Sequence, residues 1–165
     1  MFGTDGIRGR VGREPLTLEN VLALGRTVGQ LLTREPERLG LPDRSERRRV
    51  FLGRDTRGTG PMLERVLVAG LEGAGVEVTL GGVLPTPAVA YLTATEGYDL
   101  GVVVSASHNP HHDNGIKFFA AGGRKLSAQA EAAVEEVLRE GPDPVEDPCS
   151  TAVTDPDAAR RYFEA

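Results

Sequence analysis

The run L-G-V-V-V at residues 100–104 leads directly into S-A-S-H-N-P at residues 105–110. A short β-branched run without polar alternation is typical of a strand that is buried on both faces of a parallel sheet. The hydroxyl, imidazole and amide side chains that follow predict that the strand ends there in a loop. In open α/β sheets, ligands bind beyond the carboxyl ends of the strands. This stretch therefore predicts both the class of fold and the place of a binding site.

Periodic apolar positions divide the rest of the chain into alternating elements. We expect helices over residues 18–32, 61–74, 86–95 and 127–140 and from 155 on, and strands over 49–53, 76–80, 100–104 and 114–119. Irregular segments are expected at the N-terminus (1–9), in an exposed charged loop (34–49), at a tight D-N-G turn (113–115) and in a Pro/Asp linker (141–154). The alternation predicts an α/β domain of three layers, α/β/α, with a mixed, mostly parallel sheet.

The composition is that of an ordinary globular domain. The chain has 165 residues, of which 39% are hydrophobic and 26% charged. Its 19 basic and 24 acidic residues give a net charge of −5, which argues against non-specific binding to nucleic acid. The single cysteine, Cys149, cannot form an internal disulfide, no apolar run is long enough to span a bilayer, and residues 1–9 lack the pattern of a secretory signal. We therefore expect a cytoplasmic location, with neither nucleic acid nor a membrane as partner.

The loop over residues 105–115 has the residue types of a chemical site, although Ser, Asn, Pro and Gly are also what an ordinary loop uses. A Ser/His/Asp hydrolase needs a histidine from a separate loop, and Ser107 and His108 are adjacent; the G-x-S-x-G and P-loop motifs are absent. A metal site from His108, His111, His112 and Asp113 is an alternative, but sequential loop residues lack the regular spacing of helix-borne ligands. The remaining interpretation makes Ser107 an acceptor and donor of a phosphoryl group, exposed on a bend whose backbone N–H groups suit a phosphate.

Phosphoryl transfer to a hydroxyl needs a group that takes and returns the proton. Lys117 lies ten residues after Ser107 on the next expected strand, and the chain contains one other lysine, Lys125, among its 19 basic residues. A lysine can lose its proton when it is desolvated, whereas an arginine cannot. A solvated surface lysine is the alternative.

Two further segments have residue types that suit phosphate binding. The N-terminal F-G-T-D-G-I-R-G (2–9) combines three glycines with Arg8, whose guanidinium can bind a phosphate with two donors. Its alternative is a flexible start with ordinary turns. The segment G-R-D-T-R (53–57) ends an expected strand, and Asp55 could equally pair with Arg54 or Arg57 in a purely structural loop.

Taken together, F-G-T-D-G-I-R-G (2–9), G-R-D-T-R (53–57), S-A-S-H-N-P (105–110) and D-N-G-I-K-F-F (113–119) resemble the motifs of the phosphohexomutase family, in the family's order. The resemblance covers essentially the whole chain and is closest to the bacterial phosphoglucosamine mutase branch. The phosphomannomutase/phosphoglucomutase branch more often has Thr where this chain has Ser105, and a different N-terminal motif.

The resemblance implies a role for each matching residue. It makes Ser107 the phosphoserine, with Lys117 and Arg8 handling proton and charge beside it and His108 and Asn109 shaping its loop. The residues implied to contact substrate or phosphate are Thr4, Gly6, Arg54 and Asn109. Mg²⁺ would be bound by the phosphate on Ser107 together with an aspartate loop of the D-G-D-x-D-R type, which this chain lacks.

The resemblance also implies a division of the chain. Residues 1–154 would be domain I, the phosphoserine domain, and residues 155–165 the start of a linker helix toward a second domain. The parent enzyme would interconvert glucosamine 6-phosphate and glucosamine 1-phosphate through a bisphosphate, with three further domains as partners. The 165-residue chain alone would then be inactive. The alternatives are a phosphomannomutase/phosphoglucomutase, and a non-enzymatic domain that binds sugar phosphates.

Overall fold

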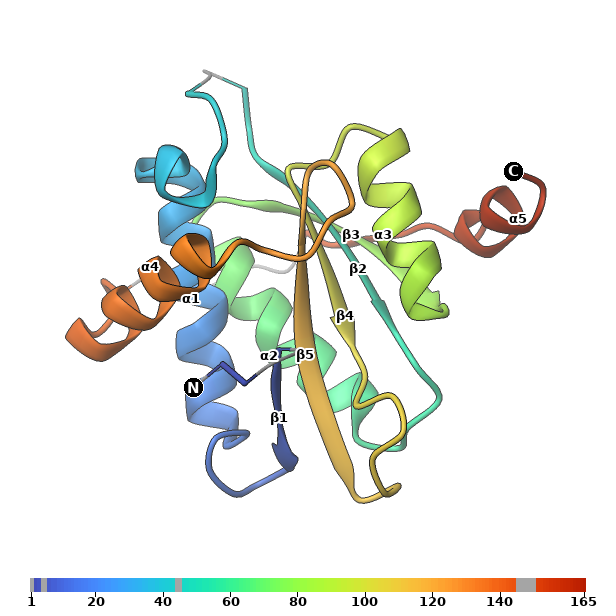
Figure 1. Ribbon diagram of the computed structural model, residues 1–165, viewed down its shortest axis with the longest axis horizontal. Helices are drawn as coiled ribbons and strands as arrows, with labels where there is room; N and C mark the ends of the chain where they lie inside the picture. Colours follow the sequence, from blue (N-terminus) through green and yellow to red (C-terminus); the bar gives the residue numbers. More distant parts are fainter. Residues whose placement is uncertain (1, 4–5, 44–45, 145–150) are drawn as a thin grey trace.

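A six-stranded mixed sheet, in the order β1-β5-β4-β2-β3-β6, forms the centre of the fold (Figure 1). The computed structural model describes residues 2–3, 6–43, 46–144 and 151–165. The strands are β1 (Ile7–Arg10), β2 (Arg49–Arg54), β3 (Glu77–Val83), β4 (Leu100–Val104), β5 (Asp113–Ala120) and β6 (Val153–Thr154). The helices are α1 (Leu18–Arg34), the 3-10 helix η1 (Pro36–Leu39), α2 (Gly60–Gly73), α3 (Thr86–Thr95), α4 (Ala128–Glu140) and α5 (Ala158–Phe163).

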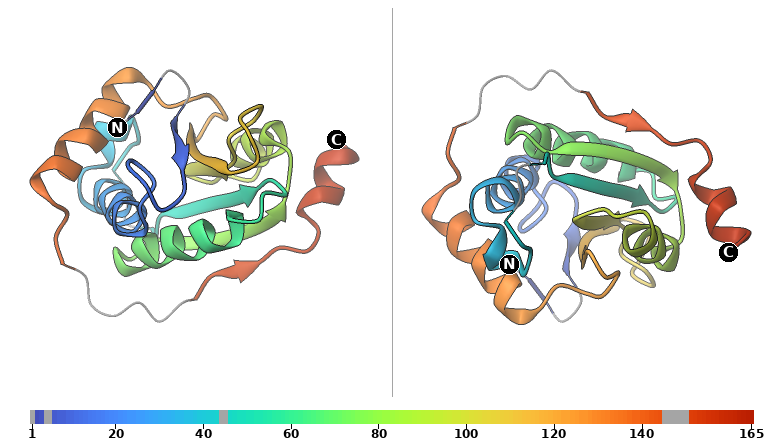
Figure 2. Two further views of the ribbon diagram at one scale, coloured as in Figure 1. Left: turned by 90° about the horizontal axis from the view of Figure 1, so that it is seen from below. Right: turned by 90° about the horizontal axis from the view of Figure 1, so that it is seen from above.

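The sheet is parallel over β4, β2, β3 and β6, whereas β5 is antiparallel to both of its neighbours, β4 and β1. Helices cover both faces: α1, α2 and α4 pack on one side, and α3 and α5 on the other (Figure 2). The expectation of a three-layer α/β domain with a mixed, mostly parallel sheet is confirmed.

The strand over 100–104 is buried along its whole length, as expected from its apolar run. Because successive side chains of a strand point to opposite faces, Val102 and Val104 lie in the core beneath α1 and α2, while Val103 lies in the second core beneath α3. Helices α1 to α4 begin within one residue of where their sequences predict, whereas α5 begins at Ala158 and not at 155. Thr17 accepts a hydrogen bond from the Asn20 N–H at 3.2 Å, which caps α1.

The N-terminal strand β1 was not expected, and the predicted D-N-G turn is wrong. Asp113, Asn114 and Gly115 lie inside β5, and the chain turns before them, where the Asp113 N–H donates to the Pro110 carbonyl at 3.0 Å. A Cβ on Gly115 would come within 2.8 Å of the Ile7 carbonyl and 2.7 Å of the Ser105 carbonyl. Glycine is therefore needed here because β1 and the end of β4 come so close to β5, and not because the chain turns.

Two other expected irregular segments are partly ordered against the core. Within residues 34–49, η1 forms, and Leu39, Leu41 and Arg48 are buried. Arg48 Nη1 donates to Asp99 Oδ1 at 3.1 Å, so a charge that the sequence suggested to be exposed is neutralised inside. Within the expected linker 141–154, β6 extends the sheet next to β3.

The C-terminal segment folds back on the domain. Helix α5 packs on α3, and Arg161 donates hydrogen bonds to Glu96 and to Asp155. The expected boundary between residues 154 and 155 thus falls between β6 and α5 and stays a prediction. In the part of the chain described, no helix is both long and apolar enough to cross a membrane.

Candidate active site

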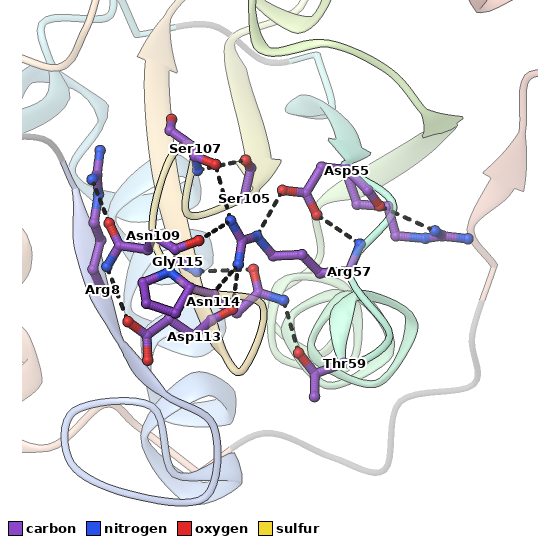
Figure 3. Close-up of polar contacts among 12 residues, drawn as sticks. Arg8, Asp55, Arg57, Thr59, Ser105, Ser107, Asn109, Asp113, Asn114 and Gly115 are labelled. Atoms are coloured by element: carbon purple, nitrogen blue, oxygen red, sulfur yellow. Dashed lines mark hydrogen bonds and ion pairs between the residues drawn. The ribbon is translucent and has the colours of Figure 1, made fainter.

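Several of the residues predicted to carry chemistry lie around the loop that joins β4 to β5, at the carboxyl end of β4 and beside the loop that follows β2. Figure 3 shows Arg8, Ser107 and Asn109 among them. The Asp55 N–H donates to the Val104 carbonyl at 3.1 Å, which continues the pairing of β2 with β4 past the strand ends. Two of the motifs recognised in the sequence therefore meet here.

Ser107 is exposed on this loop in the left-handed region, with φ 53°, and it is the one non-glycine residue in the described ranges with a positive φ. Left-handed backbone is unfavourable for a residue with a Cβ and occurs mainly where the surroundings enforce it. Its N–H donates to the Ser105 Oγ at 3.1 Å, and the buried Ser105 donates its own N–H to the Gly115 carbonyl at 2.9 Å. Ser105 thus supports the bend that presents Ser107.

Lys117 and Ser107 are brought together, as the sequence predicted. The Lys117 Nζ donates to the Ser107 Oγ at 3.0 Å, although the lysine is 7% exposed on β5. Gly6 contributes to this enclosure. It has φ 80°, and a Cβ at this position would lie 2.9 Å from Lys117 Cγ and 2.5 Å from the Ile116 carbonyl. Position 6 therefore requires glycine, and the lysine stem lies against its backbone.

Arg8 and Asn109 form a second contact at the loop. Arg8, on β1, donates from Nη1 to Asn109 Oδ1 at 3.2 Å, and Asn109 Nδ2 donates to Asp113 Oδ2 at 3.1 Å. This chain of polar side chains connects the edge strand β1 to the middle of the loop and to the start of β5. His108 is exposed beside Ser107.

Arg54 pairs with a residue of α2. Its Nε lies 3.5 Å from Glu64 Oε1 of α2, an ion pair whose side chains are 22% and 12% exposed. Burial raises the pKa of the Glu64 carboxyl, and the nearby Arg54 guanidinium opposes that rise in pKa. Thr4, the remaining predicted contact residue, lies outside the described residues.

The histidines and the aspartate of the loop do not assemble into a metal site. His112 Nε2 lies 3.7 Å from Asp113 Oδ1, and the rings of His111 and His112 meet edge to face at 5.4 Å. Within the residues that the structure places, no three side chains of His, Cys, Asp or Glu gather so that they could hold a metal ion.

Arg57 is the residue that sequence reasoning missed. It was considered as a partner of Asp55, and its Nε does donate to Asp55 Oδ2 at 3.1 Å. Its other guanidinium N–H groups, however, donate to backbone carbonyls of the Ser107 loop, as Figure 3 shows in part. One signal in the sequence could have indicated this role. G-R-D-T-R (53–57) follows a strand, as the Ser107 loop does, and the carboxyl ends of parallel strands meet at one edge of a sheet.

Comparison with known proteins places the chain in one family. The family model described as phosphoglucomutase/phosphomannomutase, alpha/beta/alpha domain I, matches residues 1–143. The chain is 50% identical over 164 residues to the phosphoglucosamine mutase of Xanthomonas euvesicatoria pv. vesicatoria, covering 99% of this chain and 35% of the relative. It is 49% identical to that of Burkholderia thailandensis, covering 99% of this chain and 36% of the relative.

Solved structures of similar fold include a putative phosphomannomutase from Thermus thermophilus, with a TM-score of 0.77 and 29% identity over 95% of this chain and 33% of that one. A phosphoglucomutase/phosphomannomutase family protein from Burkholderia thailandensis has a TM-score of 0.75 and 27% identity, over 99% of this chain and 34% of that one. The chain thus spans about a third of the length of the proteins it matches.

Proposed function

Because this chain belongs to the phosphoglucomutase/phosphomannomutase family, as its α/β/α domain I, we propose that it is the phosphoserine domain of a phosphoglucosamine mutase. The identity of 50% to a phosphoglucosamine mutase, against 29% and 27% to the structures of the phosphomannomutase and phosphoglucomutase type, supports glucosamine phosphates as substrates. The proposed reaction interconverts glucosamine 6-phosphate and glucosamine 1-phosphate.

The observation that carries the proposal is the contact of 3.0 Å between Lys117 Nζ and Ser107 Oγ at the open end of the sheet. In the proposed first step, the phosphoryl group on Ser107 moves to the free hydroxyl of the sugar monophosphate. The bond from phosphorus to the serine oxygen breaks, a bond from phosphorus to the sugar oxygen forms, and a proton passes from the sugar hydroxyl to Ser107 Oγ. Lys117 is close enough to hold that proton at the serine oxygen.

The bisphosphate then turns around and returns its other phosphoryl group to Ser107. This second step reverses the first in every bond, so Lys117 takes the proton from Ser107 Oγ as the serine oxygen attacks phosphorus. Arg8 supplies positive charge next to the loop through its contact with Asn109. We assign to His108 and Asn109 the shaping of the loop. Contacts with substrate or phosphate are assigned to Thr4, Gly6, Arg54 and also Asn109.

We propose Mg²⁺ as the cofactor because the resemblance to the family implies it. When bound, it would neutralise charge on the phosphoryl group that is transferred. The described residues of this chain do not themselves form a site for it. Phosphoserine 107 would supply one oxygen ligand, and the remaining ligands would come from an aspartate loop in another domain. For this reason we propose that the 165-residue chain alone does not turn over substrate.

The division of the chain is proposed on the same basis. Residues 1–154 form the phosphoserine domain and residues 155–165 begin the link toward a second domain, with three further domains completing the enzyme. The share of each relative that this chain covers, 35% and 36%, is compatible with that arrangement.

A chimera tests the function directly. Residues 1–165 replace the matching segment of the phosphoglucosamine mutase of Xanthomonas euvesicatoria, and we call the product the chimera. It should interconvert glucosamine phosphates and carry one phosphate on Ser107, as mapped by peptide mass spectrometry. The chain alone should show no turnover.

Two variants and a substrate panel complete the experiment. Ser107→Ala should abolish turnover and the mapped phosphate, whereas Ser127→Ala, which alters the N-cap of α4, should leave both unchanged. A higher kcat/KM with mannose or glucose phosphates would favour the phosphomannomutase/phosphoglucomutase alternative. An inactive chimera, beside an active Xanthomonas parent, would favour a domain that only binds sugar phosphates.

A further inference from the structure

The guanidinium of Arg57 uses its whole hydrogen-bonding capacity around the Ser107 loop. An arginine side chain has five N–H donors in a fixed planar fork. Nε donates to Asp55 Oδ2 at 3.1 Å. Nη1 donates to the carbonyls of Pro110 and Asp113 at 2.6 and 3.0 Å, and Nη2 to those of Ser107 and Asn109 at 2.9 Å each.

These four carbonyls span the loop from Ser107 to the first residue of β5. Fixing a carbonyl also fixes the plane of its peptide unit, because the unit is rigid. One side chain from the neighbouring β2–α2 loop therefore sets the orientation of several peptide planes, including the one that follows the left-handed Ser107. Left-handed backbone persists at a residue with a Cβ only where the surroundings enforce it. Arg57 supplies four such contacts from outside the loop.

Arg57 is itself held in place. Its side chain is 11% exposed, and Asp55 accepts both the Arg57 N–H at 3.0 Å and the Arg57 Nε–H at 3.1 Å. The Asp55 N–H in turn donates to the Val104 carbonyl at the end of β4. The Arg57 guanidinium is thus fixed relative to β4, the strand that precedes the Ser107 loop.

We infer that Arg57 is the positioning residue of the site: it holds the 107–113 backbone so that Ser107 is presented in its left-handed conformation within reach of Lys117. The inference rests on the proposed function of Ser107 for its meaning in catalysis. Lysine cannot take this role, since an ammonium group has three donors on one nitrogen and no planar fork to reach four separated carbonyls.

The test uses the 165-residue chain itself. Amide hydrogen exchange of residues 105–113, and the HN–Hα coupling and Cβ chemical shift of Ser107, are measured by NMR in Arg57→Lys and Arg57→Ala. Arg161→Lys is the matched control, because Arg161 also makes several hydrogen bonds, to Glu96 and Asp155, but on the far helix α5. Asp55→Asn keeps the Arg57 guanidinium but weakens the hydrogen bonds that Asp55 accepts from it. It serves as a milder variant if the Arg57 variants do not fold.

We expect loop amides to exchange at least about tenfold faster in Arg57→Lys, since several hydrogen bonds from the charged guanidinium to loop carbonyls are lost. Amides of α1 should change by less than about twofold. The HN–Hα coupling of Ser107 should move away from the value that a positive φ gives. Asp55→Asn should show smaller changes in the same direction. Added guanidinium ion should restore part of the protection of the loop amides in Arg57→Ala. Arg161→Lys should leave the loop unchanged.

Unchanged loop exchange and an unchanged Ser107 coupling in the Arg57 variants would overturn the inference. So would an acceleration of equal size in the loop and in α1, because that result reports lost global stability. None of these measurements requires a phosphate on Ser107. A chimera that never carries phosphate on Ser107 would therefore refute the proposed function separately from the role of Arg57 in the loop.

Discussion

Replacing Lys117 separates proton transfer from simple positive charge at the proposed nucleophile. Lys117→Arg keeps the charge, but an arginine does not give up its proton in proteins. Lys117→Met keeps the length of the apolar stem and removes both charge and proton. In the native chain the Nζ lies 3.0 Å from Ser107 Oγ, and the side chain is 7% exposed. The lysine is therefore shielded from water, although the Ser107 side chain that it contacts is exposed.

The expected fall in kcat follows from the proposed role of Lys117 as a general acid–base. A positioned general acid–base contributes roughly 10²–10⁴ in rate, which corresponds to about 2.7–5.4 kcal/mol in the activation free energy. We expect kcat of the chimera to fall by that factor in both variants. Charge alone would predict that Lys117→Arg stays active and that Lys117→Met does not, so the pair of variants distinguishes the two explanations.

The assay is steady-state turnover of the chimera, combined with quenched-flow mass spectrometry of the phosphate on Ser107. Lys125→Arg is the control: it is the other lysine of the chain, its side chain is 42% exposed, and its Nζ pairs with Glu131 at 3.2 Å, away from the loop. A Lys117→Arg chimera that transfers phosphate within about threefold of the unmodified rate would refute the reasoning.

Three further predictions concern stability of the chain, measured by urea unfolding. Gly6→Ala should lower the free energy of unfolding by about 2 kcal/mol or more, because the new Cβ meets the β5 backbone at 2.5 Å with φ at 80°; Gly58→Ala, with no heavy atom within 4 Å, should have little effect. Asn114→Ala should cost about 1–3 kcal/mol, since the fully buried amide accepts from one neighbour and donates to another, and a loss no larger than that of Gly58→Ala would contradict this. Hydrogen bonds from Arg161 lower the pKa of Asp155, so its contribution to stability is present above the unfolded pKa of about 3.9 and is lost as the pH falls through the lower folded pKa. Asp155→Asn should therefore destabilise the chain at pH 7, by at most about 1 kcal/mol, and the difference should shrink as the pH falls below about 3.9; a difference that is independent of pH would contradict the pairing.

The sequence predicts the layers of this fold well because its signals are local. The apolar run at 100–104 and the caps of α1 and α4 are each recognised from a few consecutive residues. The segments that were mispredicted depend on partners far away in the chain. Strand β1 forms because β5 offers it an edge. The turn expected at 113–115 is instead the start of β5, where Ile7 and Ser105 approach Gly115.

The site shows the same division. Ser107 and Lys117 are ten residues apart on adjoining elements, so a loop followed by a strand brings them together, and their residue types single them out. Arg54 and Arg57 cannot be distinguished in this way. Both are arginines beside Asp55 in one motif, and what separates them is the direction of each side chain: Arg54 faces Glu64 of α2, and Arg57 faces the loop.

The partners of Arg57 also explain why the role of Arg57 cannot be predicted from the residue types of the loop. It binds main-chain carbonyls, which every residue possesses, so the sequence of 107–113 could change without removing its acceptors. Ser107 can then be exposed to a substrate while the groups that fix its backbone, Ser105 and Arg57, are shielded from water. The proposed reaction would use this combination, because Ser107 would give up a phosphoryl group in one step and accept one in the other. The serine would have to be accessible in each step, and its geometry would have to be the same in both.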